Sequence, residues 1–217
     1  MGNRAVITWS KAEDVSRSRE IGIYLHWNGG INSVRAFLKY CELKGYRKPD
    51  QDNYGYARLC QVIGNFFGGT TSVGIDMCSC LDCDNGDNGT YICEGWDIVD
   101  TQYRRGAEHT DCDIEDALLS INSKQPEAEK LPIGLIRSAV LGKVPRKDLK
   151  IGERIYVQNF AGEWEVHKII GYGKDRVVNG HDVLGIPFFD RYKYSDGYSG
   201  EDNINNYVLD EYVYSAE

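Results

Sequence analysis

The sequence has no long apolar run. No stretch approaches the roughly 20 consecutive apolar residues that a membrane-spanning helix requires, and residues 1–8 lack the apolar core of a secretory signal. The seven cysteines are an odd number, which in a chain without an export signal favours reduced thiols over a disulfide framework. We therefore expect a cytoplasmic protein with no membrane partner.

Catalytic and cofactor-binding signatures are also lacking. The four histidines show no recognisable pairing with Cys41 or Cys60, which fall on apolar helix faces where inert packing is expected. Segment 26–30, His-Trp-Asn-Gly-Gly, offers backbone N–H groups to an anion but lacks the Lys-Ser/Thr of a phosphate loop, so a tight strand-to-helix turn is favoured. We expect a non-enzymatic protein with no cofactor, with a thiol enzyme as one alternative.

The sharpest metal signal is the spacing Cys78-x-Cys80-x2-Cys83, with Cys93 further along the chain. Four thiolates satisfy tetrahedral zinc, but zinc usually takes them from two short cysteine pairs, and no second pair accompanies Cys93. Half-buried strand cysteines explain the spacing better, so we expect no bound metal and keep a zinc enzyme as an alternative. The carboxylates of segment 82–87 lack two ligands of a calcium loop, and a turn is favoured there.

The N-terminal part alternates between strand and helix patterns. Residues 4–9 and 21–27 are typical of strands, and apolar residues then recur with helical spacing in two segments. In the first of these Asn32 is the expected N-cap, and the second begins near Asn53 and ends at Gly68. A third helix is expected over residues 113–123.

Between these helices the sequence predicts a β-hairpin. Segments 72–81 and 90–99 have strand character, and the Asp/Asn-Gly pairs of loop 84–89 supply the positive φ values that hairpin turns need. The polar segment 122–130 is the expected linker, after which residues 151–157 and 164–170 predict a second hairpin. We therefore predict an α+β fold, with an N-terminal mixed sheet and two to three helices in residues 1–124, including the acidic hairpin, and a smaller β-rich, barrel-like domain in residues 131–217.

The acidity of the chain is concentrated in one segment. Residues 76–116 contain twelve acidic residues and two basic ones, a net charge of −10, whereas the whole chain carries −8. Such a field repels nucleic acid and attracts basic surfaces, including nucleic-acid channels on other proteins. A solvated acidic face explains the charge equally well. The candidate partner-binding residues are Asp82, Asp84, Asp87, Glu94, Asp97 and Asp100.

A milder basic cluster lies in the C-terminal part. On a small β-domain it would form a positive rim able to contact nucleic acid, although a solvated rim is the more ordinary explanation. Its members are Arg137, Lys143, Arg146, Lys147, Lys150 and Arg154.

Three segments carry a resemblance to a known group of proteins: residues 2–7 (Gly-Asn-Arg-Ala-Val-Ile), 23–30 (Ile-Tyr-Leu-His-Trp-Asn-Gly-Gly) and 81–89 (Leu-Asp-Cys-Asp-Asn-Gly-Asp-Asn-Gly). They are similar to a family found in prophages and other mobile elements of gut-associated Gram-positive bacteria. The resemblance covers mainly residues 1–100 and supplies no catalytic residues.

Some proteins of such elements are anti-CRISPR inhibitors of Cas9. The resemblance therefore implies a phage protein that acts in the host bacterial cytoplasm, and we expect it to inhibit a host defence nuclease, of the Cas9 type, through protein–protein interaction at its acidic surface. A DNA-associated accessory protein of a mobile element, which would use the basic cluster, is the alternative.

Overall fold

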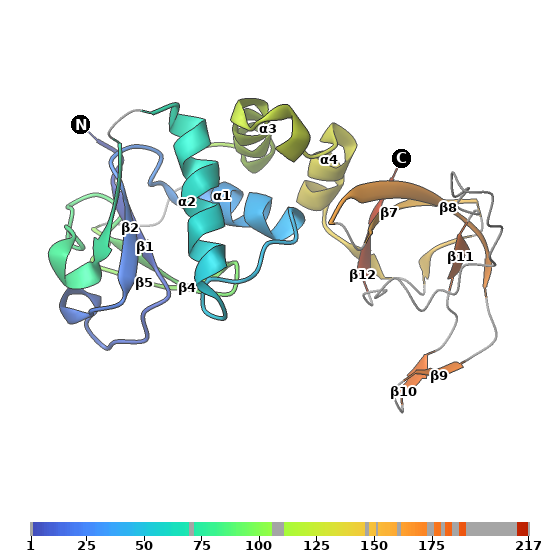
Figure 1. Cartoon of the computed structure of the whole chain (residues 1–217), viewed down its shortest axis with the longest axis horizontal. Coiled ribbons are helices and arrows are strands. Elements are labelled where there is room, and N and C mark those ends of the chain that lie inside the picture. The colour runs from blue at the N-terminus through green and yellow to red at the C-terminus, as the bar shows by residue number, and fades with distance from the viewer. Residues whose placement is uncertain are drawn as a thin grey trace. The chain divides into compact units, whose positions relative to one another are not determined.

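The computed structural model describes residues 2–69, 72–105, 111–145, 148–150, 152–159, 162–172, 176–178, 181–183, 187–189 and 212–216 (Figure 1). The chain divides into two compact units, Met1–Lys130 and Leu131–Glu217. It combines helices with sheets that are mixed or antiparallel, so the predicted α+β class is confirmed. No described helix combines the length and the apolar character needed to cross a membrane.

A five-stranded mixed sheet is the centre of the N-terminal unit, with the strand order β3-β2-β1-β4-β5. The central strand β1 pairs antiparallel with β2 and parallel with β4, while the outer pairs β2–β3 and β4–β5 are antiparallel. All four residues of β1 are buried, so this strand is covered on both faces. The strands are β1 (Ala5–Thr8), β2 (Ile21–Leu25), β3 (Val73–Met77), β4 (Thr90–Glu94) and β5 (Asp97–Gln102).

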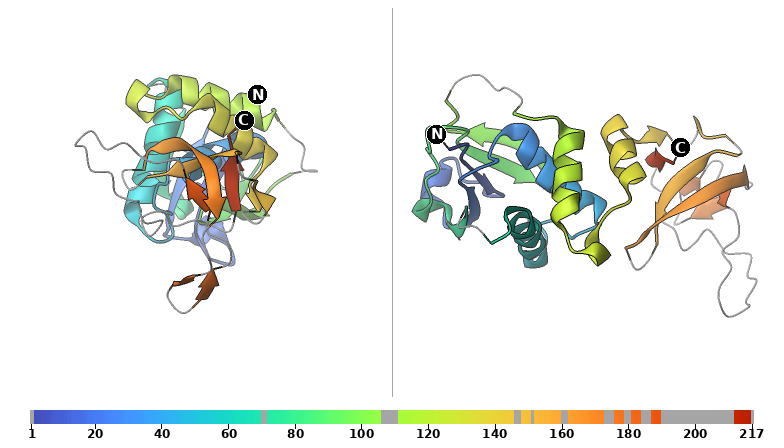
Figure 2. Two further views of the ribbon diagram at one scale, coloured as in Figure 1. Left: turned by 90° about the vertical axis from the view of Figure 1, so that its right-hand side faces the viewer. Right: turned by 90° about the horizontal axis from the view of Figure 1, so that it is seen from above.

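Three helices lie on one side of this sheet: α1 (Ile31–Leu43), α2 (Asn53–Phe67) and α3 (Ile114–Lys124) (Figures 1 and 2). Helix α1 is the innermost, because it packs against both α2 and α3 and ten of its thirteen residues are buried. Burial on nearly all sides explains why its apolar residues extend beyond a single stripe.

Short helical turns cover the opposite face of the sheet. These are η1 (Val15–Arg17) and η2 (Cys78–Cys80), which pack against each other. Val6 of β1 forms a buried cluster there with Val15, Cys78 and Cys83, and Ile92 of β4 packs against it. Since side chains alternate along a strand, the residues next to Ile92 face the helices instead.

The hairpin predicted from segments 72–81 and 90–99 is wrong. Strand β3 lies at one edge of the sheet and pairs with β2, whereas β4 lies on the far side of β1. The actual hairpin joins β4 to β5 through Gly95 and Trp96. The Asp/Asn-Gly signals did report real backbone geometry, since Gly86 and Gly89 have φ values of 75° and 69°. They occur in a crossover loop, because positive φ fixes a bend without fixing which strands pair.

The crossover loop 84–89 is organised by the buried amide of Asn85. Its nitrogen donates to the carbonyl of Gly89, and its oxygen accepts from the backbone N–H groups of Asp87 and Gly89. Asn88 then attaches the loop to the start of β1, with its side-chain nitrogen 2.9 Å from the carbonyl oxygen of Arg4. These asparagines replace the hydrogen bonds that a regular strand would have supplied.

The segment 122–130, expected as a linker, is packed into the N-terminal unit. Helix α3 runs to Lys124, and η3 (Glu127–Glu129) follows it. The buried Gln125 donates to the carbonyls of Val62 and Ile121, and the hydroxyl of Tyr40 donates to Asn122. A polar composition therefore did not mean exposure, because these side chains satisfy backbone groups inside the unit.

The C-terminal unit contains a helix and a second sheet with the order β11-β8-β7-β12-β6. The predicted hairpin of residues 151–157 and 164–170 is present as the antiparallel pair β7–β8. In the described strands β11 and β6 end the order, so the barrel-like form stays a prediction. The elements are α4 (Ile133–Leu141), β6 (Val144–Pro145), β7 (Arg154–Gln158), β8 (Trp164–Tyr172), β11 (Pro187–Phe189) and β12 (Tyr212–Ser215), with β9 (Arg176–Val178) and β10 (His181–Val183) as a separate pair.

The two loop glycines should respond differently to substitution. A Cβ at Gly89 would lie 2.3 Å from the carbonyl oxygen of Gln102, whereas a Cβ at Gly86 would meet nothing closer than 3.8 Å. We expect Gly86→Ala to lower the free energy of unfolding by about 1–2 kcal/mol, the cost of a positive φ, and Gly89→Ala to lower it by clearly more. Urea denaturation of both variants measures this, and equal losses would contradict it.

Candidate functional site: the acidic edge of the sheet

Strand register gathers three of the predicted partner-binding carboxylates on one face of the sheet. Glu94 lies opposite Asp97, and Asp100 lies opposite Ile92, which faces away from the helices. A register shift between Ile92 and Cys93 leaves Val99 as an extra residue, so Asp97 and Asp100 share a face although they are three residues apart. We call Glu94, Asp97 and Asp100 the acidic edge.

The carboxylates of the acidic edge are exposed charges. All three side chains are exposed, and no ion pair within the described part of the chain includes any of them. Glu94 and Asp97 are cross-strand neighbours, a placement in which like charges destabilise a sheet. The fold thus tolerates local repulsion here that a cationic partner would relieve.

The turn that carries these carboxylates is held rigidly against the core. The indole N–H of Trp9 donates to the carbonyl of Gly95 at 2.8 Å, and the indole N–H of Trp96 donates to the carbonyl of Tyr46 at 3.2 Å. Asp50 accepts from the backbone N–H of Gly95, and Lys48 lies beside this glycine. The positions of Glu94 and Asp97 are consequently fixed before any partner binds.

The other three predicted carboxylates lie beside arginines of the same chain, two arginines to three carboxylates. Arg4 forms an ion pair of 2.7 Å with Asp87 and lies 3.8 Å from Asp82, while Arg105 pairs with Asp84 at 2.9 Å. The sequence alone did not separate these three carboxylates from the acidic edge, because Arg4 is 83 positions from Asp87 and no local pattern indicates that they pair.

The hydrogen bond from Arg4 lowers the pKa of Asp87. The pair therefore stabilises the fold above the ordinary pKa of aspartate, and this contribution is lost as the pH falls through the lowered value.

Segment 26–30 bends from β2 into α1, and the helix N-terminus behind it is already occupied. Helix α1 begins at Ile31 with Gly30 as its N-cap, so the expected cap Asn32 is wrong. Asp111 supplies the missing cap: one oxygen accepts from the N–H of Asn32 at 2.9 Å and the other from the Ser33 hydroxyl at 2.6 Å. The anion at this positive helix end is thus part of the protein itself.

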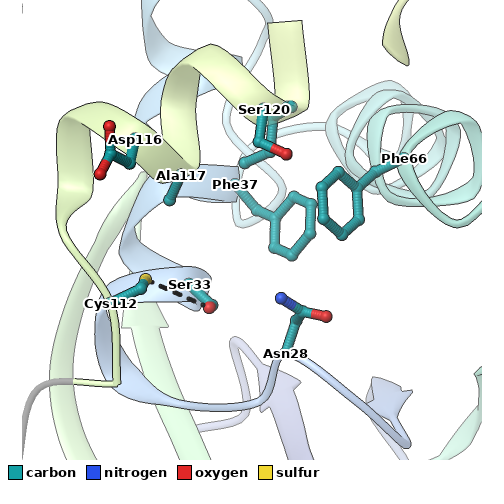
Figure 3. A pocket seen from close by; sticks show the side chains of 9 residues that line it. Asn28, Ser33, Phe37, Phe66, Cys112, Asp116, Ala117 and Ser120 are labelled. Carbon is teal, nitrogen blue, oxygen red and sulfur yellow. Dashed lines mark hydrogen bonds between the residues drawn. The ribbon is translucent and has the colours of Figure 1, made fainter. Parts of the chain in front are cut away.

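A pocket of about 240 Å³ lies beside this cap (Figure 3). The rings of Phe37 and Phe66 meet edge to face above it at 5.2 Å, and Asn28 lies below them with a φ of 55°. Ser33 and Cys112 form one side, with oxygen and sulfur 3.5 Å apart. The pocket is smaller than most ligand sites, and none of the residues predicted as sites lines it.

The structure does not bring the four candidate zinc ligands together. Cys78 and Cys83 share the buried cluster beside η2, and contact with the Cys83 thiol lowers the pKa of Cys78. Cys80 is exposed, while Cys93 faces the helices because its neighbour Ile92 faces the cluster. Within the described residues no group of three or more histidine, cysteine, aspartate or glutamate side chains could hold a metal ion.

The helix cysteines have the environment of packed, unreactive thiols. Burial raises the pKa of Cys41 well above its ordinary value and that of Cys60 to about 11. Of the histidines, His26 is exposed and His167 is buried 3.2 Å from Glu165, whereas His109 and the His181 side chain lie outside the described residues. No thiol–histidine pair is formed by the side chains that the structure describes.

The basic cluster lies in the C-terminal unit, and its described members Arg137, Lys143, Lys150 and Arg154 are all exposed. Arg146 and Lys147 lie outside the described residues. Arg154 on β7 is directly opposite Lys168 on β8, a second cross-strand pair of like charge.

Comparison of the chain with family models, with curated proteins and with solved structures finds no match in any of the three.

The Asp111 cap explains why position 30 must be glycine. A Cβ built on Gly30 would lie 2.1 Å from Cγ of Asp111, whereas a Cβ on Gly64, inside α2, meets nothing within 4 Å. We expect Gly30→Ala to lower the free energy of unfolding by about 1–3 kcal/mol through overpacking and loss of the cap. The matched variant Gly64→Ala should raise it by about 0.4–1 kcal/mol. Thermal or urea denaturation distinguishes them, and a harmless Gly30→Ala would show that Asp111 does not cap α1.

Proposed function

We propose that this chain is a mobile-element protein that inhibits a host defence nuclease, of the Cas9 type, by binding the nuclease's basic nucleic-acid groove without catalysis. The observation that carries the proposal is the acidic edge, three exposed carboxylates held on one face by strand register. The class of target comes from the resemblance to prophage and mobile-element proteins. The mode of binding comes from the charges.

Two features of the acidic edge favour a basic partner over a merely solvated face. Lysine or arginine side chains placed between Glu94 and Asp97 would relieve the repulsion of that cross-strand pair. The anchoring of the turn through Trp9 and Trp96 means that little conformational freedom is lost on binding. Such a surface competes for the same cationic side chains that hold phosphates, so association should weaken steeply as salt rises.

Asp82, Asp84 and Asp87 have a smaller part in this proposal than the sequence suggested. Their carboxylates already face Arg4 and Arg105, so a partner would have to displace an internal ion pair to use them. The proposed contact surface is therefore Glu94, Asp97 and Asp100.

A charge-matched pair of variants tests the mechanism. The triple variant Glu94→Lys, Asp97→Lys, Asp100→Lys should lose inhibition of DNA cleavage by about ten-fold or more, since charges at an interface of this kind contribute to both encounter and affinity. The control Glu13→Lys, Glu42→Lys, Glu127→Lys changes the net charge equally at three exposed positions and should inhibit like the wild type. Cleavage by a panel of RNA-guided nucleases, measured at low and physiological salt, provides the readout.

Two results would reject the proposal. One is wild-type protein in excess leaving cleavage by the whole panel untouched, which would remove the nuclease as target. The other is equal inhibition by the two triple variants, which would remove the acidic edge as the contact surface.

A DNA-associated accessory protein is the second candidate, because Arg154 and Lys168 place like positive charges opposite one another on the C-terminal sheet. A duplex phosphate backbone would be complementary to these positive charges. On this alternative, wild-type protein retards duplex DNA in a gel, and Lys150→Glu, Arg154→Glu, Lys168→Glu abolishes the shift. The control Lys11→Glu, Arg19→Glu, Lys48→Glu, at exposed sites of the N-terminal unit, retains it. Absence of any shift at low salt would discard this candidate.

A further inference from the structure

Strand β3 is the second edge of the N-terminal sheet, and its backbone has a definite orientation. The N–H of Cys78 donates to the carbonyl of Glu20, and the N–H of His26 donates to the carbonyl of Ser72, both at 2.9 Å. Even-numbered residues of this strand therefore direct their backbone groups toward β2. Because these directions alternate along a strand, the N–H and C=O groups of Val73, Ile75 and Met77 point outward from the sheet.

No strand that the structure describes pairs with these outward groups. Among the residues that the structure describes, no hydrogen bond reaches the outward N–H of Val73 or Ile75. The N–H of Met77 is bonded only to the carboxylate of its neighbour Asp76, at 2.7 Å. The edge thus offers an almost intact template for another strand.

The side chains of the same residues form an apolar stripe. Val73, Ile75 and Met77 are paired with Leu25, Ile23 and Ile21 of β2, and so share the face that the helices cover. The helices cover this margin of the sheet only in part, because Ile75 is 55% exposed, Met77 40% and Ile21 45%. Exposed apolar side chains beside an unpaired strand are typical of a site that is covered in the working protein.

The opposite edge of the same sheet is protected. Strand β5 carries Asp97 and Asp100 and an irregular register near Val99, features that prevent edge-to-edge pairing. Strand β3 has the sequence Val-Gly-Ile-Asp-Met, with a single charge, no proline and no lysine. Of the two edge strands, only β3 therefore has the properties that permit another strand to add.

We propose that two copies of the chain pair through β3, antiparallel and about a two-fold axis at Ile75, to form one continuous ten-stranded sheet. In this register Ile75 lies opposite Ile75 of the second copy, and Val73 lies opposite its Met77. Each is a hydrogen-bonded pair, so every outward N–H and C=O of the three residues finds a partner.

The strand is complementary to itself in this register. Strand β3 has apolar residues at its first, third and fifth positions, a pattern that is unchanged when the strand is reversed. In two antiparallel copies the apolar stripe therefore continues unbroken across the axis. Asp76 falls opposite Gly74 of the second copy, where no side chain opposes it. Moving the two-fold axis one residue toward the C-terminus would place Asp76 opposite Asp76 of the second copy. Moving it one residue toward the N-terminus would leave Met77 unpaired, so the register centred on Ile75 is preferred.

Sedimentation velocity on the full chain tests the dimer. The wild type should sediment as a species of twice the 24.5 kDa chain mass. Ile75→Lys, which places two lysines against each other on the axis, should be a folded monomer. The control Val99→Lys adds the same charge at a comparably exposed residue of β5, 53% accessible, and should stay dimeric. Circular dichroism of both variants establishes that they are folded.

A cysteine on the axis tests the register. In a hydrogen-bonded antiparallel pair the two Cα atoms are about 5.5 Å apart, within the range that a disulfide spans. In a background of Cys80→Ser, which removes the exposed native thiol, Ile75→Cys should form an intermolecular disulfide with oxidised glutathione, releasing two equivalents of reduced glutathione. Val99→Cys in the same background should remain largely unlinked.

The proposal fails if the wild type stays monomeric at the highest concentration at which it is soluble. It fails equally if a dimer forms that Ile75→Lys does not weaken, or if Val99→Cys links as fast as Ile75→Cys, because linkage would then reflect collision instead of a fixed register.

Discussion

The parallel pairing of β1 with β4 is the constraint on which the N-terminal unit depends. Strand β4 lies beyond β1 and runs in the same direction as β3, so no tight turn can join β3 to β4 and the chain must cross the sheet from the β3 edge before it enters β4. It crosses on the face opposite the helices, where Cys78 and Cys83 become buried against Val6. The loop then reaches Arg4, whose position at the start of β1 accounts for its pairing with Asp87.

Strand pairing also determines which charges are available at the surface. The −10 segment contains carboxylates that differ completely in environment, because the crossover loop brings some of them to Arg4 and Arg105 while the β4–β5 register sets Glu94 against Asp97. An internal ion pair lowers the net charge that a carboxylate presents to a partner. Repulsion between two like charges on neighbouring strands has the opposite effect, because a cationic partner would relieve it. The number of acidic residues in a segment is thus a poor guide to the charge that segment presents.

Local patterns predicted local structure well and long-range pairing poorly. The two first strands, the three helices and the β7–β8 hairpin follow from periodicity, which depends on neighbours in the sequence. The hairpin of segments 72–81 and 90–99 failed because Asn-Gly dipeptides specify φ and not the partner strand, and the real turn at Gly95 and Trp96 lacks that signature. Of the acidic site, the residue types were predictable. Which of the carboxylates pair with Arg4 was not predictable, because no sequence pattern marks a contact across 83 positions.

The Asp111 cap has a consequence for how the chain is made. Asn32 and Asp111 are 79 residues apart, and Trp9 and Gly95 are 86 apart, so β1 and α1 leave the ribosome well before the groups that complete them. At roughly 5–20 residues per second, translation leaves the start of α1 without its carboxylate for about 4–16 s. During that interval the nascent chain exposes a helix built to be surrounded on nearly all sides, which makes it a natural substrate for chaperones that shield apolar segments. The unit can complete its packing only after β4, β5 and α3 have all left the ribosome.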